Sequence, residues 1–229
     1  MTQTEPARAY ADFLSILRRS TELLSEDPVR EEIFSVERLE KYAGYLAGVL
    51  TIGQQPERGH SLLPSLKECH AQLLEAYLAL TTAIRDKQQV SPAAEWLVDN
   101  FHIVEDQLRE IKRDLPANYY HELPKLATGE LAGYPRVYAM ALAIIAHTDS
   151  RLDADTLRRY LKAFQQTSPL RIGELWAVAI TLRIALVEHL KPLAVRIVNA
   201  RQKREQADAL ADQLLVLAAN PEAEAHDLV

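Results

Sequence analysis

A long apolar stripe after Ser91-Pro92 constrains the fold more than any other feature of the chain. Six apolar side chains follow this dipeptide at alternating spacings of four and three residues, the period of one face of an α-helix. The six are Leu97, Phe101, Val104, Leu108, Ile111 and Leu115. Serine caps helices and proline fits the first helical turn, so the dipeptide marks a helix start. The pattern predicts one continuous helix that ends at Pro116.

Similar signals recur along the rest of the chain. Further helices are expected over residues 7–24, from 28 or 35 to 50, and over 61–87, 136–147, 153–166 and 173–219, with an irregular stretch at 118–135. The last helix is apolar nearly all round as far as Val187, which predicts a central and buried position. Only 7 of the 229 residues are glycine, and no convincing stretch alternates as a strand does. These observations predict an all-α fold, a multi-helix bundle of roughly eight helices.

The distribution of breaks suggests three parts of the chain. Residues 1–89 are expected to form an N-terminal helical subdomain, residues 90–219 the core helical bundle, and residues 220–229 a tail or linker.

Charge and cysteine content exclude several classes of protein. The formal net charge of −6 argues against nucleic-acid binding. The longest apolar run, residues 137–146, is too short to span a bilayer. Cys69 is the only cysteine, so no internal disulfide forms, which suits a reducing compartment. A cytoplasmic protein without a membrane span is expected.

Candidate metal and catalytic motifs have simpler structural explanations. Asp153-Ala154-Asp155 matches the metal-binding DxD pattern, but it opens a helix, where Asp153 serves as the N-cap. Asp99 and His102 resemble half of a di-iron site, and the second half is missing. Neither a Gly-rich phosphate loop nor a nucleophile elbow is present. We therefore expect no catalytic residue, no metal and no cofactor.

A polar line with an embedded tryptophan lies opposite the apolar stripe. It is either an ordinary solvent-exposed helix face or a contact surface for a protein or sugar, since Trp and Arg are enriched at interfaces. Tyrosines and one arginine downstream could extend it. The candidate surface comprises Trp96, Asp99, Asn100, His102, Asp106, Tyr119, Tyr120, Tyr134 and Arg136.

Arg183 interrupts the apolar run of the last helix. A buried guanidinium without a partner is costly, so a structural ion pair is expected. Glu95, Asp99 and Asp149 are the candidate partners.

Two segments resemble a known family. The first begins Ser91-Pro92-Ala93-Ala94-Glu95-Trp96-Leu97-Val98-Asp99-Asn100-Phe101-His102 and continues in Tyr119-Tyr120, Glu122-Leu123-Pro124-Lys125-Leu126, Gly133-Tyr134-Pro135-Arg136-Val137-Tyr138 and His147-Thr148-Asp149-Ser150; the second is Ile172-Gly173-Glu174-Leu175-Trp176-Ala177. Together they resemble the N-terminal cytoplasmic region of the cyclic β-1,2-glucan synthases, bacterial inner-membrane proteins. Arg171 departs from the family pattern, where a threonine could close a capping box with Glu174.

The resemblance implies a function through the parent protein. Such synthases polymerise glucose from UDP-glucose in a glycosyltransferase domain and carry a phosphorylase-like domain near the C-terminus. Neither Trp96 nor Trp176 follows an arginine, so the QxxRW signature of processive transferases is absent and no catalytic residue carries over.

The resemblance further implies a non-catalytic helical domain on the inner face of the bacterial inner membrane, with a structural or regulatory role. Its expected partners are the transferase and membrane domains of the synthase, a second copy of itself, or the nascent β-1,2-glucan. A gluco-oligosaccharide-binding module and a free-standing helical adaptor remain alternatives.

Overall fold

The structure is a computed structural model. The part of the chain that it describes folds mainly into helices. That part covers residues 32–53 and 59–219, with the single positions Glu5, Ala7, Arg8, Tyr10, Ala11 and Leu14. It contains eight helices and, in place of strands, two isolated β-bridges, so the all-α prediction is confirmed. The helices are α2 (Val36–Val49), α3 (Leu62–Arg85), α4 (Pro92–Asp99), α5 (Phe101–Asp114), α6 (Ala117–Glu122), α7 (Arg136–Thr148), α8 (Ala154–Thr167) and α9 (Ile172–Ala219).

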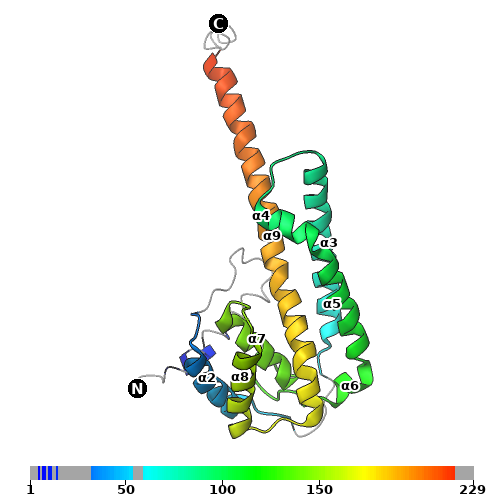
Figure 1. The fold of residues 1–229 in the computed structure, drawn as a ribbon, viewed down its shortest axis with the longest axis vertical. Helices are drawn as coiled ribbons and strands as arrows, with labels where there is room; N and C mark the ends of the chain where they lie inside the picture. The colour runs from blue at the N-terminus through cyan, green and yellow to red at the C-terminus, as the bar shows by residue number, and fades with distance from the viewer. Residues whose placement is uncertain are drawn as a thin grey trace.

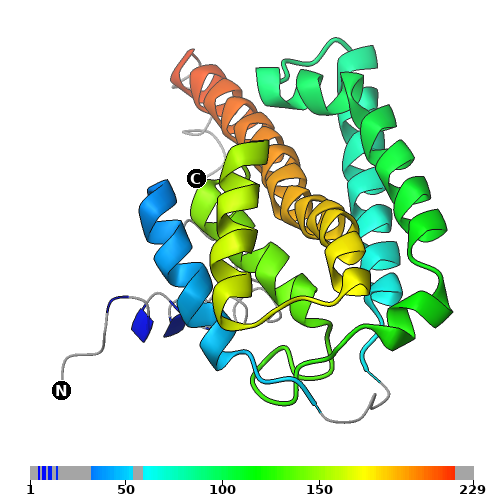
Figure 2. The ribbon, with the colours of Figure 1, turned by 60° about the horizontal axis from the view of Figure 1, so that its bottom comes forward.

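Helix α9 is the axis of the bundle (Figure 1). Its 48 residues continue through Pro192 and extend about 72 Å. Helices α3, α4, α5 and α7 all contact it, while α2 packs mainly against α8 (Figure 2). Most of its buried residues lie in the first half, from Glu174 to Ala194, as the apolar run predicts. That half is not buried all round, however, because Ile172 and Trp176 in its first turns are 71% and 72% exposed. The second half leaves the bundle and projects beyond α4.

Side-chain caps set four of the helix starts. Ser35, Ser61, Ser91 and Asp153 each accept a hydrogen bond from a backbone N–H in the first turn of α2, α3, α4 and α8. Of the two starts expected for this helix, the one after Ser35 is confirmed for α2, because residues 32–35 are not helical. Asp153 accepts from the amides of Asp155 and Thr156, so the acidic triplet caps a helix as expected.

The prediction of one continuous helix after Ser91 is wrong. The chain breaks at Asn100, whose side-chain amide donates to the carbonyl of Trp96 at 2.8 Å and competes with the helical hydrogen bonds. Helix α4 therefore turns away from the axis of α5 (Figures 1 and 2). Every residue of the apolar stripe is nevertheless buried, because both helices face the same core.

The stretch from 118 to 135 is more ordered than predicted. It begins within α6 and then forms a loop held by Lys125, whose ammonium donates to three backbone carbonyls, those of Tyr120, His121 and Leu123, each at 3.1 Å. Gly133 takes a left-handed φ of 82° there and approaches His60, which leaves no room for a side chain. A buried lysine used as a backbone anchor cannot be recognised from sequence spacing.

Helices on both sides of residue 89 contribute to one buried cluster, since α3 packs against α9. The division at residue 89 into subdomains stays a prediction. Most of the helix expected over 7–24, and the tail at 220–229, lie outside the described residues. Across the described ranges, no helix is both long and apolar enough to cross a bilayer.

Candidate functional site

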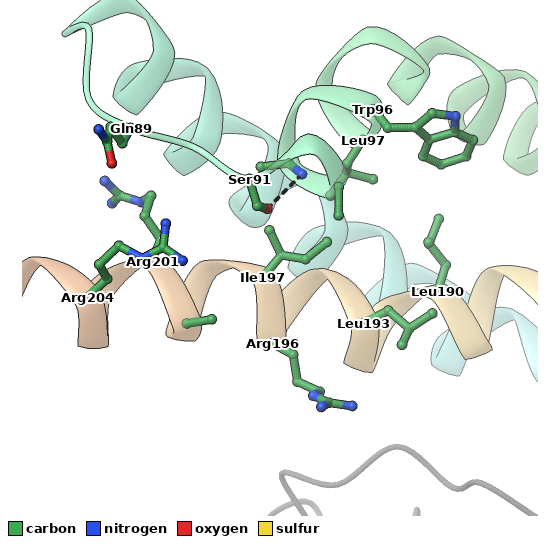
Figure 3. A pocket seen from close by; sticks show the side chains of 13 residues that line it. Gln89, Ser91, Trp96, Leu97, Leu190, Leu193, Arg196, Ile197, Arg201 and Arg204 are labelled. Atoms are coloured by element: carbon green, nitrogen blue, oxygen red, sulfur yellow. Dashed lines mark hydrogen bonds between the residues drawn. The ribbon is translucent and has the colours of Figure 1, made fainter.

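A groove lies between α4 and α9. Its volume is about 600 Å³. Leu97 of α4 faces Leu190 and Ile197 of α9 across an apolar floor (Figure 3). Arg196, Arg201 and Arg204 also line the groove. Gln89 lies at the same end of the groove as Arg201 and Arg204 (Figure 3). We call this feature the α4–α9 groove.

Helix α4, which forms one wall of the groove, is short and capped at its start. Ser91 accepts a hydrogen bond from the Ala94 amide at 3.2 Å, and Pro92 occupies the first turn. Ala94 and Leu97 are buried, whereas Trp96, which also lines the groove, remains 59% exposed. An apolar floor with guanidinium groups at its edge can accept an amphipathic segment that carries carboxylates.

The structure splits the candidate surface of Trp96, Asp99, Asn100, His102, Asp106, Tyr119, Tyr120, Tyr134 and Arg136. Trp96 lies on α4, with Asp99 at its end, and His102 and Asp106 lie exposed on α5. Tyr119 and Tyr120 lie on α6, where Tyr119 donates to the carbonyl of Gly173 at the start of α9.

Trp96 on α4 and the two tyrosines on α6 lie far apart. Trp96 lies at the Leu190 end of the groove (Figure 3), and Leu190 is 17 residues from Gly173, or about 26 Å along the helix. The break at Asn100 is one reason, since it turns the tryptophan away from the α5 face. No common sugar platform joins Trp96 to the two tyrosines.

The tyrosines of this set are used in the fold. The hydroxyl of Tyr120 donates to the carbonyl of His60, and the Tyr134 ring lies 5.2 Å from the imidazole of His60. Both residues are half-buried. They hold the loop after α6 against the segment before α3.

Arg136 does not belong to any surface, which corrects the sequence-based assignment. It is 1% exposed and forms a two-pronged ion pair with Glu174, at 2.9 Å from Nε and 2.7 Å from Nη2. Its remaining donors reach Ser168 Oγ and the carbonyl of Pro169. The pair ties the start of α7 to the start of α9 and to the loop between α8 and α9.

Glu174 also completes the start of α9. Its Oε2 accepts from the backbone N–H of Arg171 at 3.0 Å, which is the glutamate half of a capping box. The other half needs a hydroxyl at 171, and this chain has arginine there. The start of α9 lacks the hydroxyl half of the capping box, and Glu174 and Arg136 stabilise it instead.

Arg183 has carboxylate partners other than those expected. Its guanidinium lies 3.4 Å from both Glu110 and Asp114. The side chain is 36% exposed rather than buried. Both partners come from the last turns of α5, which packs along α9, whereas Glu95 and Asp99 lie on α4, beyond the break.

A second polar cluster was missed by sequence reasoning. The carboxylate of Glu188 accepts from the Tyr138 hydroxyl at 2.6 Å and from the Ser65 hydroxyl at 2.9 Å. Burial raises the pKa of Glu188 above its ordinary value of 4.5, against the opposing hydrogen bonds and the charge of Lys191. The only sequence signal for this cluster was a glutamate, Glu188, directly after the apolar run of α9.

Glu188 predicts a pH-dependent stability. A carboxyl group whose pKa is higher in the folded than in the unfolded state stabilises the fold below pH 4.5, and that contribution is lost as the pH rises through the folded-state pKa. Glu188→Gln stays neutral. We expect the free energy of unfolding of the parent to fall relative to this variant between pH 4 and 8, measured by urea denaturation. A pH-independent difference, equal to that of the exposed control Glu95→Gln, would contradict the assignment.

The described residues with reactive side chains serve the fold. Cys69 is buried and its thiol donates to the carbonyl of Val187 at 3.4 Å. Burial raises its pKa to about 12, which keeps it protonated rather than nucleophilic. Among the residues whose placement is described, no three His, Cys, Asp or Glu side chains gather as metal ligands.

Comparison with known proteins gives one relationship. No family model matches the chain. The chain is 34% identical over 200 residues to the cyclic beta-(1,2)-glucan synthase NdvB of Rhizobium meliloti (strain 1021). The match covers 83% of this chain and 7% of that protein, so the chain spans a small part of the relative's length. The chain is thus homologous to one region of a cyclic β-(1,2)-glucan synthase, and the resemblance inferred from its motifs is confirmed.

Proposed function

We propose that this chain is a non-catalytic helical domain of a cyclic β-1,2-glucan synthase, with a structural role. In this proposal it lies at the N-terminal, cytoplasmic end of the synthase and holds other parts of the protein in place during synthesis of β-1,2-glucan from UDP-glucose. The observation that carries the proposal is the 34% identity, which extends over 83% of the chain.

Two features of the fold support a docking role. The α4–α9 groove combines an apolar floor with arginines, which suits a protein segment better than a free sugar. The second half of α9 projects from the bundle with exposed apolar side chains, at Leu210, Leu214, Leu215 and Val216. Exposed apolar residues gathered on one element mark interaction surfaces.

The buried polar groups support a non-catalytic role. Arg136 and Glu174 are fully used in fastening helix ends, and Lys125 in holding a loop. The polar atoms of these groups are engaged in hydrogen bonds within the fold. The reaction is then the work of other domains of the synthase.

Deletion of the homologous region from a full-length synthase tests the proposal. We expect the glucan yield to fall at least tenfold while the remaining protein still reaches the membrane. The 229-residue chain supplied separately should restore part of the yield, yet should not itself consume UDP-glucose. Unchanged yield, cyclisation and chain length after deletion would refute the structural role, and UDP-glucose turnover by the chain alone would refute its non-catalytic nature.

A further inference from the structure

A seam of residues that are small or apolar, except for Arg204, runs along α9 and continues outside the bundle. Its positions alternate at three and four residues, the average of 3.5 that is typical of coiled coils. They are Leu190, Leu193, Ile197, Ala200, Arg204, Ala207, Ala211 and Leu214. The first five line the α4–α9 groove. The last three lie beyond it on the projecting half of α9, where no helix of the described part covers them.

The projecting half is exposed on every face. All residues from 202 to 216 are exposed, including Leu210 at 57%, Leu215 at 68% and Val216 at 62%. An isolated helix of this length is marginal in water, because most helical stability in proteins comes from packing of an apolar face. The seam therefore lacks a partner helix.

The charges along this part of α9 fall into two blocks. Arg196, Arg201, Lys203 and Arg204 precede Glu205, Asp208 and Asp212. Arg201 pairs with Glu205 at 2.5 Å and donates to Gln88 at 2.6 Å. Arg196, Arg204, Asp208 and Asp212 form no ion pair with the described part of the chain. Two copies of a helix with a basic block followed by an acidic block bring opposite charges together only when the copies are antiparallel.

We propose that a second copy of this chain docks on α9 as an antiparallel coiled coil. The inference rests on the proposed structural role and names its surface and its partner. Residues 207–214 of each copy lie along the α4–α9 groove of the other. Parallel helices would instead place the basic block of one copy against that of the other, which costs free energy through like-charge repulsion.

The seam fixes the register of the two helices. The seam of a coiled coil alternates between two heptad positions, called a and d. In an antiparallel pair an a position of one helix faces a d position of the other, so Leu214 of the second copy lies beside Ile197. The same register sets Arg204 opposite the small Ala207 of the second copy and within reach of its Asp208. A polar residue at one seam position reduces stability but specifies register, which is the role of Arg204.

Charge reversal of each block provides the test. Sedimentation equilibrium of the 229-residue chain should show a dimer. The acidic-block variant, Asp208→Lys with Asp212→Lys, and the basic-block variant, Arg196→Glu with Arg204→Glu, should each weaken self-association at least tenfold. Mixing the two variants should restore a heterodimer. A control with the same change of charge on exposed residues away from α9, Asp106→Lys with Glu122→Lys, should dimerise as the parent does.

Cysteine cross-linking tests the direction. A mixture of the Ile197→Cys and Leu214→Cys variants should form a disulfide-linked pair, whereas Leu214→Cys alone should not. The native Cys69 is buried and does not compete. A monomer at all concentrations, with helical content intact, would overturn the proposal and leave another partner for the groove. A disulfide between two chains of the Leu214→Cys variant would overturn the antiparallel arrangement. Neither readout involves glucan yield, so failure here is separate from failure of the deletion test.

Discussion

Replacement of Glu174 by alanine is expected to lower the free energy of unfolding by about 3–5 kcal/mol, the usual cost of breaking a buried ion pair by removing one partner. The side chains of Arg136 and Glu174 are 2% and 1% exposed. The variant leaves the guanidinium charged and desolvated opposite an empty space. It also removes the acceptor for the Arg171 amide, so the start of α9 loses its cap. Urea denaturation followed by circular dichroism measures the loss.

Two control variants separate the causes of this loss. Asp106→Ala removes one partner of an exposed ion pair with Arg109, and it should cost only a small fraction as much, since solvent screens such pairs. Glu174→Leu combined with Arg136→Met removes both charges and should be less destabilising than Glu174→Ala alone. A loss for Glu174→Ala no greater than that of Asp106→Ala would show that the pair contributes nothing to the fold.

Replacement of Phe164 by alanine should cost a similar amount, about 3–5 kcal/mol. Phe164 lies on α8, is fully buried, and packs in the core between α8 and its neighbours. Truncation removes its transfer free energy and opens a cavity that a rigid helical core cannot close. Thermal and urea denaturation both report the change. The exposed Gln166→Ala, two residues along the same helix, is the matched control; equal losses for the two variants would contradict the assignment of Phe164 to the core.

Phe164 and the ion pair should also be energetically coupled. The guanidinium of Arg136 lies 5.6 Å from the centroid of the Phe164 ring. A double-mutant cycle with Phe164→Ala and Glu174→Ala is therefore expected to be non-additive, because both variants disturb the surroundings of one arginine. Additive losses would place the ring and the pair in independent parts of the core.

Local signals explain why the helices could be predicted from the sequence. A capping side chain acts on an amide two or three residues away, and an apolar stripe depends only on spacing, so Ser61, Ser91 and Asp153 mark helix starts without any tertiary information. The apolar run before Val187 likewise predicted that most buried residues of α9 lie in its first half, although it did not show that Trp176 is exposed. The sequence also carried the family motifs, and the 34% identity to the synthase confirmed the resemblance.

The candidate surface was predicted less well, because a surface is defined by neighbours. Spacing placed Trp96 beside a polar line of His102 and Asp106 on one continuous helix, yet the chain breaks at Asn100 and puts them on two helices. Arg136 seemed available because its exposure depends on Glu174 and Ser168, which lie 38 and 32 residues away in the sequence. The groove was missed altogether, since α4 and α9 contribute to it from positions about a hundred residues apart.

By itself, the sequence determined the all-α class, most of the helix boundaries and the relationship to the glucan synthases, because these follow from short-range hydrogen bonding, periodicity and motif order. Only the tertiary structure decided where α4 lies on α9, which charges are buried in pairs, and which half of α9 is left without a covering helix. The physical reason is that burial and desolvation arise between residues distant along the chain, and no local pattern encodes which of them will meet.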